Sequence, residues 1–142
     1  PEITVVITTY NLEAYIGTCL EELFSGTYQD FDVVLVDDGS KDQTVDIVET
    51  YAQRYPGRIH PIFLQKNLGS PAKTRNWALN SGFIDGKYVV FLDGDDSLES
   101  EYLERLHMLA LQSGADTVIC AYDRVEEKAA ACCAQKCRAF QR

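Results

Sequence analysis

The 142-residue sequence lacks several features that would assign it to a class of protein. No apolar run approaches the roughly 18 to 20 residues that a membrane-spanning helix needs. Basic residues are few, since 13 Lys and Arg stand against 22 Asp and Glu, which gives a net charge of −9. A nucleic-acid-binding surface needs a basic footprint, so this charge argues against DNA or RNA as a partner. An acidic protein that binds phosphate would do so through a divalent cation.

Signals for export and for cross-linking are also missing. Residues 1–10 have no basic segment and predict a strand rather than a signal peptide. The chain starts at Pro1 instead of Met, so we expect that it is trimmed and that targeting signals have been lost. Five cysteines are an odd number and form no disulfide framework, which favours a reducing cytoplasm. Cys19 and Cys120 fall in apolar patterns and are predicted to be core residues.

What the sequence does contain is a regular alternation of strand-like and helix-like segments. Continuous apolar and β-branched runs predict five strands, over residues 3–9, 31–36, 59–65, 87–92 and 116–122. Apolar residues at helical spacing predict four helices, over residues 12–24, 45–55, 71–79 and, capped by Ser97, 98–110. This order predicts an α/β fold with a doubly wound, mainly parallel sheet that is flanked by helices.

The composition changes after residue 123. Residues 1–123 carry the alternation and predict one domain. The Ala- and Cys-rich residues 124–142 predict either a helix or the start of a further, truncated region. Cys132, Cys133 and Cys137 are bunched there, but no paired Cys-x₂-Cys or His completes a zinc site, so we assign them no role.

Acidic residues follow two of the predicted strands. In a doubly wound sheet, ligands bind outside the carboxyl ends of the strands, which meet at one edge that we call the carboxyl edge. That edge gathers five aspartates, Asp37, Asp38, Asp93, Asp95 and Asp96. Carboxylates packed so closely repel one another and are costly to desolvate, so the cluster indicates a bound cation.

The stretch VVFLDGDDSL, residues 89–98, predicts the metal site. Asp93 and Asp95 form an Asp-x-Asp pair, and the small Gly94 between them leaves room for a ligand to approach. Such carboxylates are hard-oxygen ligands for Mg²⁺ or Mn²⁺, with phosphate oxygens completing the coordination shell. The alternative is that the aspartates only form the turn and cap after a strand.

Two other strand ends offer contacts to a nucleotide. In VLVDDGS, one of Asp37 and Asp38 builds the turn, and the other can accept hydrogen bonds from a base or ribose. Tyr10 follows the first strand and either stacks on a base or is an ordinary boundary residue.

In GSPAKTRNWAL, Lys73 and Arg75 lie at the start of a helix whose free N–H groups favour an anion. The alternative is that both are solvated surface residues. Trp77 is predicted to be a core residue. His60 and His107 are unconnected to the carboxyl edge, and we assign them no role.

Four ordered motifs between residues 3 and 122 resemble family 2 glycosyltransferases of the Rossmann-like GT-A fold: VVITTYN, VDDGSKDQT, NLGSPAKTRNWAL and YVVFLDGDDSL. The resemblance implies a nucleotide-sugar donor, with UDP-sugar first among the choices, whose diphosphate is bridged by Mg²⁺ or Mn²⁺. It implies nucleotide-sugar contacts from Thr8, Tyr10, Asp38, Lys73, Arg75 and Asp93, and metal ligation by Asp95 and Asp96.

The same resemblance implies an inverting, hexosyltransferase-type reaction in polysaccharide or cell-surface glycan synthesis. A base deprotonates the hydroxyl of a glycan or lipid-linked acceptor while the metal stabilises the leaving nucleoside diphosphate. Such an enzyme is expected in the cytoplasm, at the inner membrane face. The family's base lies well beyond the metal motif, and this sequence ends 46 residues after Asp96. We therefore identify no catalytic base and expect the chain alone to bind donor weakly and to transfer little.

Other interpretations of the sequence stay open. A non-catalytic nucleotide-sugar-binding module would carry the same motifs. A phospho-acceptor receiver domain would also place an acidic pair after one strand and a phosphorylated residue, here Asp93, after a later one. Two features argue against a receiver domain. Such a domain has no extra strand and helix before its acidic pair, here VLVDD, and it carries a Lys after the fifth strand, which this sequence lacks. A haloacid dehalogenase-type phosphotransferase would carry its Asp-x-Asp motif on the first strand.

Overall fold

The computed structural model describes residues 1–122 and the backbone of residues 137–140. Its strands are β1 (Ile3–Thr9), β2 (Phe31–Asp37), β3 (Ile59–Phe63), β4 (Tyr88–Asp93), β5 (Thr117–Cys120) and β6 (Cys137–Phe140). Its helices are α1 (Ile16–Ser25), α2 (Thr44–Arg54), α3 (Pro71–Leu79) and α4 (Tyr102–Ser113). Within the described part of the chain, no helix has the length and apolar content needed to span a membrane. Contacts divide the chain into two units, residues 1–24 with 29–98 and residues 25–28 with 99–142.

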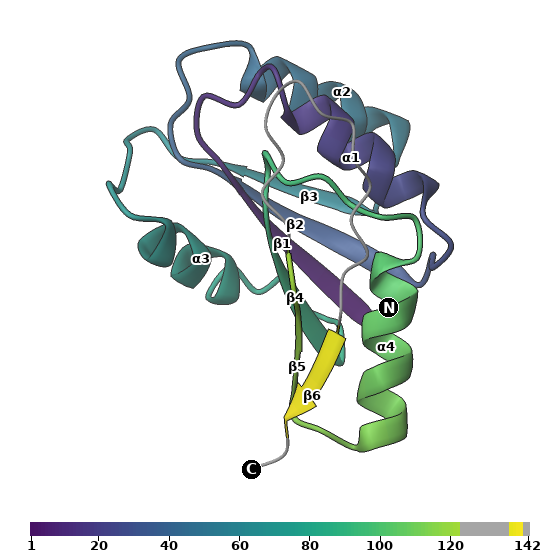
Figure 1. Ribbon diagram of the computed structural model, residues 1–142. Coiled ribbons are helices and arrows are strands. Elements are labelled where there is room, and N and C mark those ends of the chain that lie inside the picture. Colours follow the sequence, from purple (N-terminus) through teal and green to yellow (C-terminus); the bar gives the residue numbers. More distant parts are fainter. Residues whose placement is uncertain (123–136, 141–142) are drawn as a thin grey trace. The chain divides into compact units, whose positions relative to one another are not determined.

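The first unit is built on a four-stranded parallel sheet with the order β3-β2-β1-β4 (Figure 1). The two central strands, β1 and β2, are buried along their whole length, as their continuous β-branched runs predict. Pro61 lies in the edge strand β3, where its missing N–H removes no hydrogen bond from the interior of the sheet. The predicted doubly wound parallel sheet is confirmed for these four strands.

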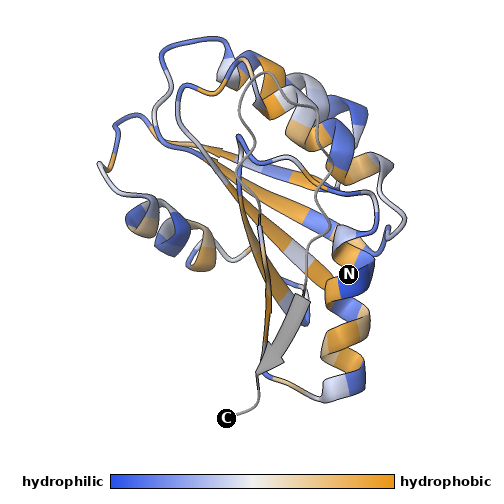
Figure 2. Cartoon of the chain, viewed as in Figure 1, coloured by the Kyte–Doolittle hydropathy of each residue, from blue (hydrophilic) through white to orange (hydrophobic). Residues whose placement is uncertain are grey.

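Helices cover both faces of this sheet. Figure 1 shows α1 and α2 on one side and α3 on the other. On the α3 side, the buried core consists of Val6, Val34, Val36 and Ala78. On its buried face, α1 carries Ile16, Cys19, Leu20, Leu23 and Phe24. Figure 2 shows the strands as an apolar layer between helices that are apolar on one face only.

The second unit contains α4, β5 and β6. β5 pairs with β6 in an antiparallel two-stranded sheet, in which Thr117 lies opposite Phe140. The prediction that this fifth strand joins the parallel sheet is therefore wrong. Its four residues alternate between exposed and half-buried positions, unlike the fully buried runs of the parallel strands. A strand's partner is not encoded in its own residues.

The predicted helix alternative for residues 124–142 is wrong over β6, where the chain is a strand. Residues 124–136, with Cys132 and Cys133, lie outside the described residues, as does the side chain of Cys137. The domain boundary at residue 123 stays a prediction.

Two helix starts differ from those predicted. The first helix begins at Ile16 rather than at residue 12, because Asn11 has a left-handed backbone (φ 49°) that turns the chain after β1. Ser97 does not cap α4, which begins at Tyr102; its hydroxyl instead donates hydrogen bonds to the carboxylate of Glu22. α4 ends at Ser113, and the Gly114 that follows it has a left-handed backbone, with φ at 60°, which is typical of a glycine after a helix.

Candidate functional site

A cavity of about 550 Å³ lies at the carboxyl edge of the parallel sheet, within the first unit. This volume is in the range of small-molecule binding sites. Six of the residues predicted from the sequence line it, Thr8, Tyr10, Asp38, Arg75, Asp93 and Asp95. Their roles as nucleotide or metal contacts stay predictions, but the structure does bring them to one place.

The strand register accounts for this convergence. Thr8 of β1 lies opposite Asp93 of β4 on one side and Val36 of β2 on the other. The Thr8 hydroxyl donates to Asp93 Oδ1 at 3.4 Å, and the backbone N–H of Asp38 donates to the Thr9 carbonyl at 2.9 Å. Parallel strands that start in register thus present their following residues at one edge.

Arg75 places a positive charge next to the acid cluster and so offsets part of the repulsion between its carboxylates. Its Nη2 donates to Asp93 Oδ1 at 2.7 Å, and the two side chains are 36% and 48% exposed. The helix α3 holds Arg75 in place through the buried Thr74 and Ala78. The Nε of Arg75 is buried and donates to no described atom, so this guanidinium keeps an unused hydrogen-bond donor.

Asp95 and Asp96 are both exposed, but only Asp95 lines the cavity. Asp96 Oδ2 accepts a hydrogen bond from the backbone N–H of Asp93 at 3.3 Å. Desolvation, followed by the neighbouring charges of Asp93 and Asp95, raises the pKa of Asp96 above its usual value. In residues 1–122, no three His, Cys, Asp or Glu side chains are grouped to hold a metal by themselves. One or two carboxylates do suit Mg²⁺ or Mn²⁺ that takes its other ligands from phosphate and water.

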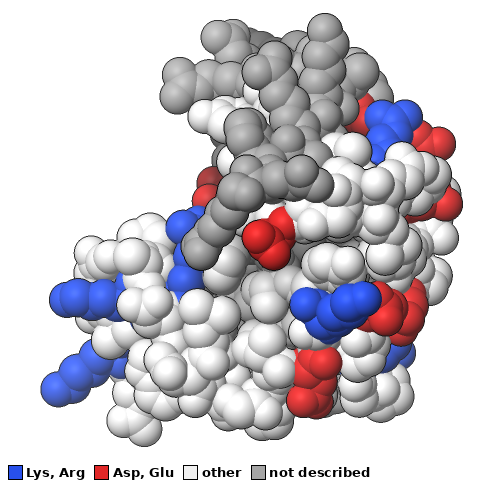
Figure 3. Space-filling model, turned by 90° about the horizontal axis from the view of Figure 1, so that it is seen from below, with Lys and Arg blue, Asp and Glu red and all other residues white. Residues whose placement is uncertain are grey.

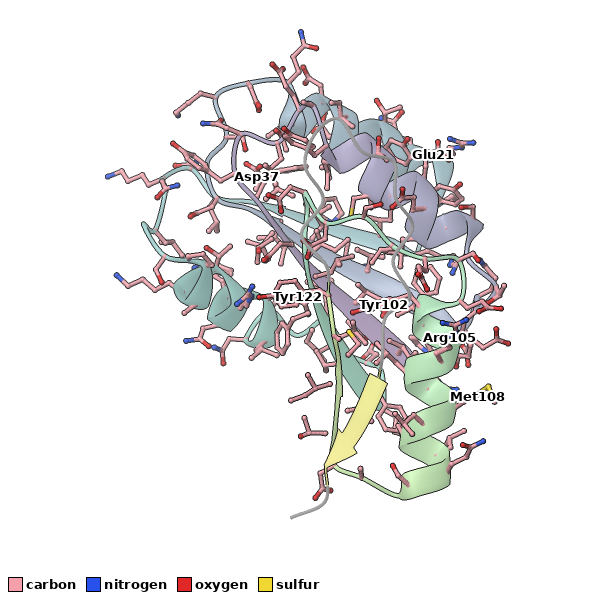
Figure 4. The ribbon with its side chains drawn as sticks, viewed as in Figure 1. Glu21, Asp37, Tyr102, Arg105, Met108 and Tyr122 are labelled. Carbon is pink, nitrogen blue, oxygen red and sulfur yellow. The ribbon has the colours of Figure 1, made fainter. Side chains whose placement is uncertain are left out.

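The structure separates the two aspartates after β2. Asp37, labelled in Figure 4, is buried and accepts hydrogen bonds from the Thr9 hydroxyl and from both the N–H and the hydroxyl of Ser40. It is therefore the turn-building residue. Asp38 lines the cavity and uses Oδ1 to accept the N–H of Leu68 at 2.8 Å, which leaves Oδ2 for a ligand.

Lys73 is exposed and does not line the cavity, and its contact to the nucleotide sugar stays a prediction. One expectation about packing is corrected. Trp77 is 49% exposed rather than a core residue. A Cβ on Gly94 would lie 2.8 Å from Thr9 Cγ2, so packing against the protein's own side chains requires a glycine at this position. Its role in the approach of a ligand stays a prediction.

Seven further residues line the cavity, Thr9, Leu12, Asn67, Gly69, Ser70, Pro71 and Thr74. None of them is among the site residues predicted from the sequence, although five lie in the motif NLGSPAKTRNWAL, in the loop between β3 and α3 and at the start of α3. Asn67 Oδ1 accepts the N–H of Gly69 at 2.6 Å and shapes the loop. The rule that ligands bind at carboxyl ends of strands applies to β3 as well, and would have located this loop.

Comparison with known proteins identifies the chain. Residues 4–132 match the family model described as Glycosyl transferase family 2. The chain belongs to this family. Membership favours the transferase interpretation over the receiver-domain and dehalogenase alternatives.

Family 2 relatives include glycosyltransferase GlyG of Streptococcus pneumoniae serotype 4, which is 30% identical over 125 residues, 88% of this chain and 40% of GlyG. The cholesterol galactosyltransferase of Borreliella burgdorferi is 35% identical over 117 residues, 82% of this chain and 31% of that protein. The chain spans less than half the length of these curated relatives.

Solved structures agree on the fold. S. aureus TarS 1–349 in complex with UDP-GlcNAc has a TM-score of 0.74 and 36% identity, covering 83% of this chain and 33% of that one. The mannosyltransferase PcManGT from Pyrobaculum calidifontis has a TM-score of 0.75 and 24% identity, covering 87% of this chain and 36% of that one. Together with the parallel sheet between helices, these neighbours show the GT-A fold.

Proposed function

We propose that this chain is the donor-binding part of a metal-dependent, inverting glycosyltransferase, and that its donor is a UDP-sugar. The observation that carries the proposal is the cavity at the carboxyl edge, where Tyr10, Asp38, Arg75 and Asp93 converge. The choice of UDP is supported by TarS, whose solved structures include complexes with UDP-GlcNAc and with UDP.

The proposed roles follow from the position of each side chain. The ring of Tyr10 is about half exposed at the cavity and can stack on a base, with Thr8 beside it. The free oxygen of Asp38 can accept an N–H from the base or a ribose hydroxyl. Arg75 and Asp93 would contact the diphosphate and ribose, with the unused Nε donor of Arg75 available to a phosphate oxygen.

We propose that Asp95 is the ligand of Mg²⁺ or Mn²⁺ and that Asp96 shares this role. When bound, such a metal neutralises charge on the departing nucleoside diphosphate. Asp95 lines the cavity directly, and Asp96 is three residues from the ion pair of Asp93 with Arg75. The exposed Lys73 at the start of α3 would add positive charge near the diphosphate without touching the cavity wall.

The proposed setting is hexosyl transfer to a glycan or lipid-linked acceptor in polysaccharide or cell-surface glycan synthesis, in the cytoplasm at the inner membrane face. Nucleic acid is not a proposed partner. On the face drawn in Figure 3, Lys and Arg side chains are interspersed with Asp, Glu and uncharged residues. No catalytic base is assigned, and we propose that the chain alone binds donor but transfers little sugar.

Calorimetric titration with UDP and GDP, with and without Mn²⁺, tests the proposal. We expect UDP to bind in the presence of Mn²⁺, and Asp95→Asn to weaken this binding about tenfold or more, because one metal ligand loses its charge. Asp46→Asn, at an exposed aspartate on α2, is the matched control and should bind as the unmodified chain does. Equal affinity with Mn²⁺ and with a chelator would contradict the metal-dependent reading.

A further inference from the structure

Five hydrogen bonds tie the loop after β1 to residues 40–44, which comprise the loop after β2 and the first residue of α2, and we call this set the loop latch. Each bond joins a backbone N–H of one loop to a side-chain oxygen. The donor and acceptor pairs are Asn11 N to Ser40 Oγ (2.9 Å), Lys41 N to Asn11 Oδ1 (2.8 Å), Leu12 N to Thr44 Oγ1 (2.9 Å), Glu13 N to Asp42 Oδ2 (3.1 Å) and Gln43 N to Glu13 Oε2 (3.0 Å).

Three consecutive N–H groups, those of residues 11–13, have side-chain oxygens of residues 40–44 as acceptors. They can converge in this way because Asn11 has a left-handed backbone, with φ at 49°. Since their acceptors are the protein's own oxygens, these N–H groups are not an open anion site. Their geometry holds the loop rather than a ligand.

Asp42 is the central acceptor of the latch. Its Oδ2 accepts Glu13 N, and its Oδ1 accepts both the N–H and the hydroxyl of Thr44, at 3.0 and 2.6 Å. The Thr44 hydroxyl is thereby oriented so that its oxygen faces Leu12 N. Desolvation works to raise the pKa of Asp42, but the hydrogen bonds from Thr44 and Glu13 outweigh it and lower the pKa, so the carboxylate is ionised.

The latch adjoins the cavity without forming its surface. Tyr10 and Leu12 line the cavity and flank Asn11 in the chain, whereas Asn11, Asp42 and Thr44 lie outside the lining. Loop residues at binding sites are commonly mobile unless such hydrogen bonds fix them. We infer that Asn11, Asp42 and Thr44 are positioning residues for the nucleotide, which hold Tyr10 and Leu12 at the cavity wall. This inference rests on the proposed function.

Two variants break the latch in different ways. Asp42→Ala removes the acceptor of three donors, and Asp42→Asn is the conservative variant that keeps one carbonyl oxygen. Asn11→Gly keeps the left-handed backbone and loses only the bond from Lys41, so it serves if Asp42→Ala does not fold. The matched control is Thr50→Val, which removes an exposed hydrogen bond within α2, the helix that begins at the latch residue Thr44.

Two measurements are made on each variant, amide hydrogen exchange without ligand and calorimetric binding of UDP with Mn²⁺. For Asp42→Ala we expect exchange over residues 10–15 to be about tenfold faster, with β1 unchanged, and the UDP dissociation constant to rise about tenfold. Asp42→Asn and Asn11→Gly should each shift both quantities by about threefold, and Thr50→Val should shift neither.

The outcomes separate this inference from the proposed function. If the unmodified chain binds neither UDP nor GDP, the proposed function fails and the inference falls with it. If the unmodified chain binds UDP and the Asp42 and Asn11 variants bind equally well, only the inference is overturned. Unchanged exchange over residues 10–15 would overturn it too, because the latch would then not order the loop.

Discussion

At the scale of single residues, Arg75 and Lys73 show how little sequence position says about role. The two are separated by one residue in the motif GSPAKTRNWAL, and the sequence predicts the same kind of contact, to the nucleotide sugar, for both. The buried Thr74 and Ala78 fix the orientation of α3, which directs Arg75 to Asp93 of β4 and leaves Lys73 exposed. The ion pair balances part of the negative charge at the carboxyl edge.

Arg75→Lys keeps the charge but loses the planar fork of donors that a phosphate or carboxylate fits. We expect the UDP dissociation constant to rise about tenfold, and Lys73→Ala to raise it only two- to threefold, roughly. The matched control is Arg105→Lys, at an exposed arginine of α4 that pairs with Glu99 and Glu101 (Figure 4). A larger effect from Lys73→Ala than from Arg75→Lys would contradict this ranking.

Cys19 lies on the buried face of α1, close to Asp93, Asp95 and Asp96. Burial, followed by the negative charges of Asp96, Glu22, Asp95 and Asp93, raises the pKa of its thiol to about 12. A raised pKa means less thiolate, the reactive form, at any pH below 12. We expect iodoacetamide at pH 8 to modify Cys19 far more slowly than the half-buried Cys120, by peptide mass spectrometry. Equal rates in the folded protein would be inconsistent with this position.

At the scale of elements, the ends of β1, β2 and β4 are held by contacts between segments that are remote in sequence. The Thr9 hydroxyl donates to Asp37 at 2.9 Å, and the Gly94 N–H donates to the Thr8 carbonyl at 3.1 Å. Away from these strand ends, the helices α1 and α2 contact each other, since Glu21 of α1 accepts hydrogen bonds from Tyr51 and Arg54 of α2 (Figure 4 labels Glu21). Those exposed contacts add little stability, so the elements are held mainly by the buried strands and helix faces.

Two glycine substitutions test the packing on two sides of α1, against the end of β4 at Gly94 and against α2 at Gly17. Gly94→Ala would place a Cβ 2.8 Å from Thr9 and 3.1 Å from Ile16, and this overpacking should cost about 1–3 kcal/mol of unfolding free energy. Gly17→Ala meets no atom closer than 3.8 Å and should stabilise α1 by roughly 0.5 kcal/mol. Urea unfolding measures both. A neutral Gly94→Ala variant would show that the loop after β4 is looser than described.

At the scale of the whole molecule, the chain has two kinds of sheet. The parallel sheet carries the core and the cavity, and each of its central strands has two neighbours. Within the described residues, the antiparallel pair of β5 and β6 has one ladder, so β5 has a single partner there. Two-stranded sheets are marginally stable without further packing.

Removing residues 137–142 should therefore affect the two sheets differently. We expect amide exchange over β5 to become at least about tenfold faster, because its ladder partner is gone. Exchange over β1 should stay unchanged, because both of its partners, β2 and β4, remain. Loss of protection in β1 as well would show that the parallel sheet depends on β6.

The sequence by itself determined the strands and helices of the parallel sheet and the edge of the sheet at which the cavity lies. Continuous β-branched runs such as Ile3–Thr9 fix a doubly buried strand locally, and Gly114 ends its helix through a backbone angle of its own. These features depend on a few neighbouring residues, so they can be predicted from the chain alone.

Only the tertiary structure decided which residues occupy the site. It placed Asp37 in the turn and Asp38 at the cavity. It paired Arg75, rather than Lys73, with Asp93. It also filled the space beside Gly94 with Thr9 and gave β5 an antiparallel partner. Each of these outcomes depends on a contact between residues well apart in the chain. Local propensity and periodicity carry no information about such contacts, whereas packing decides them.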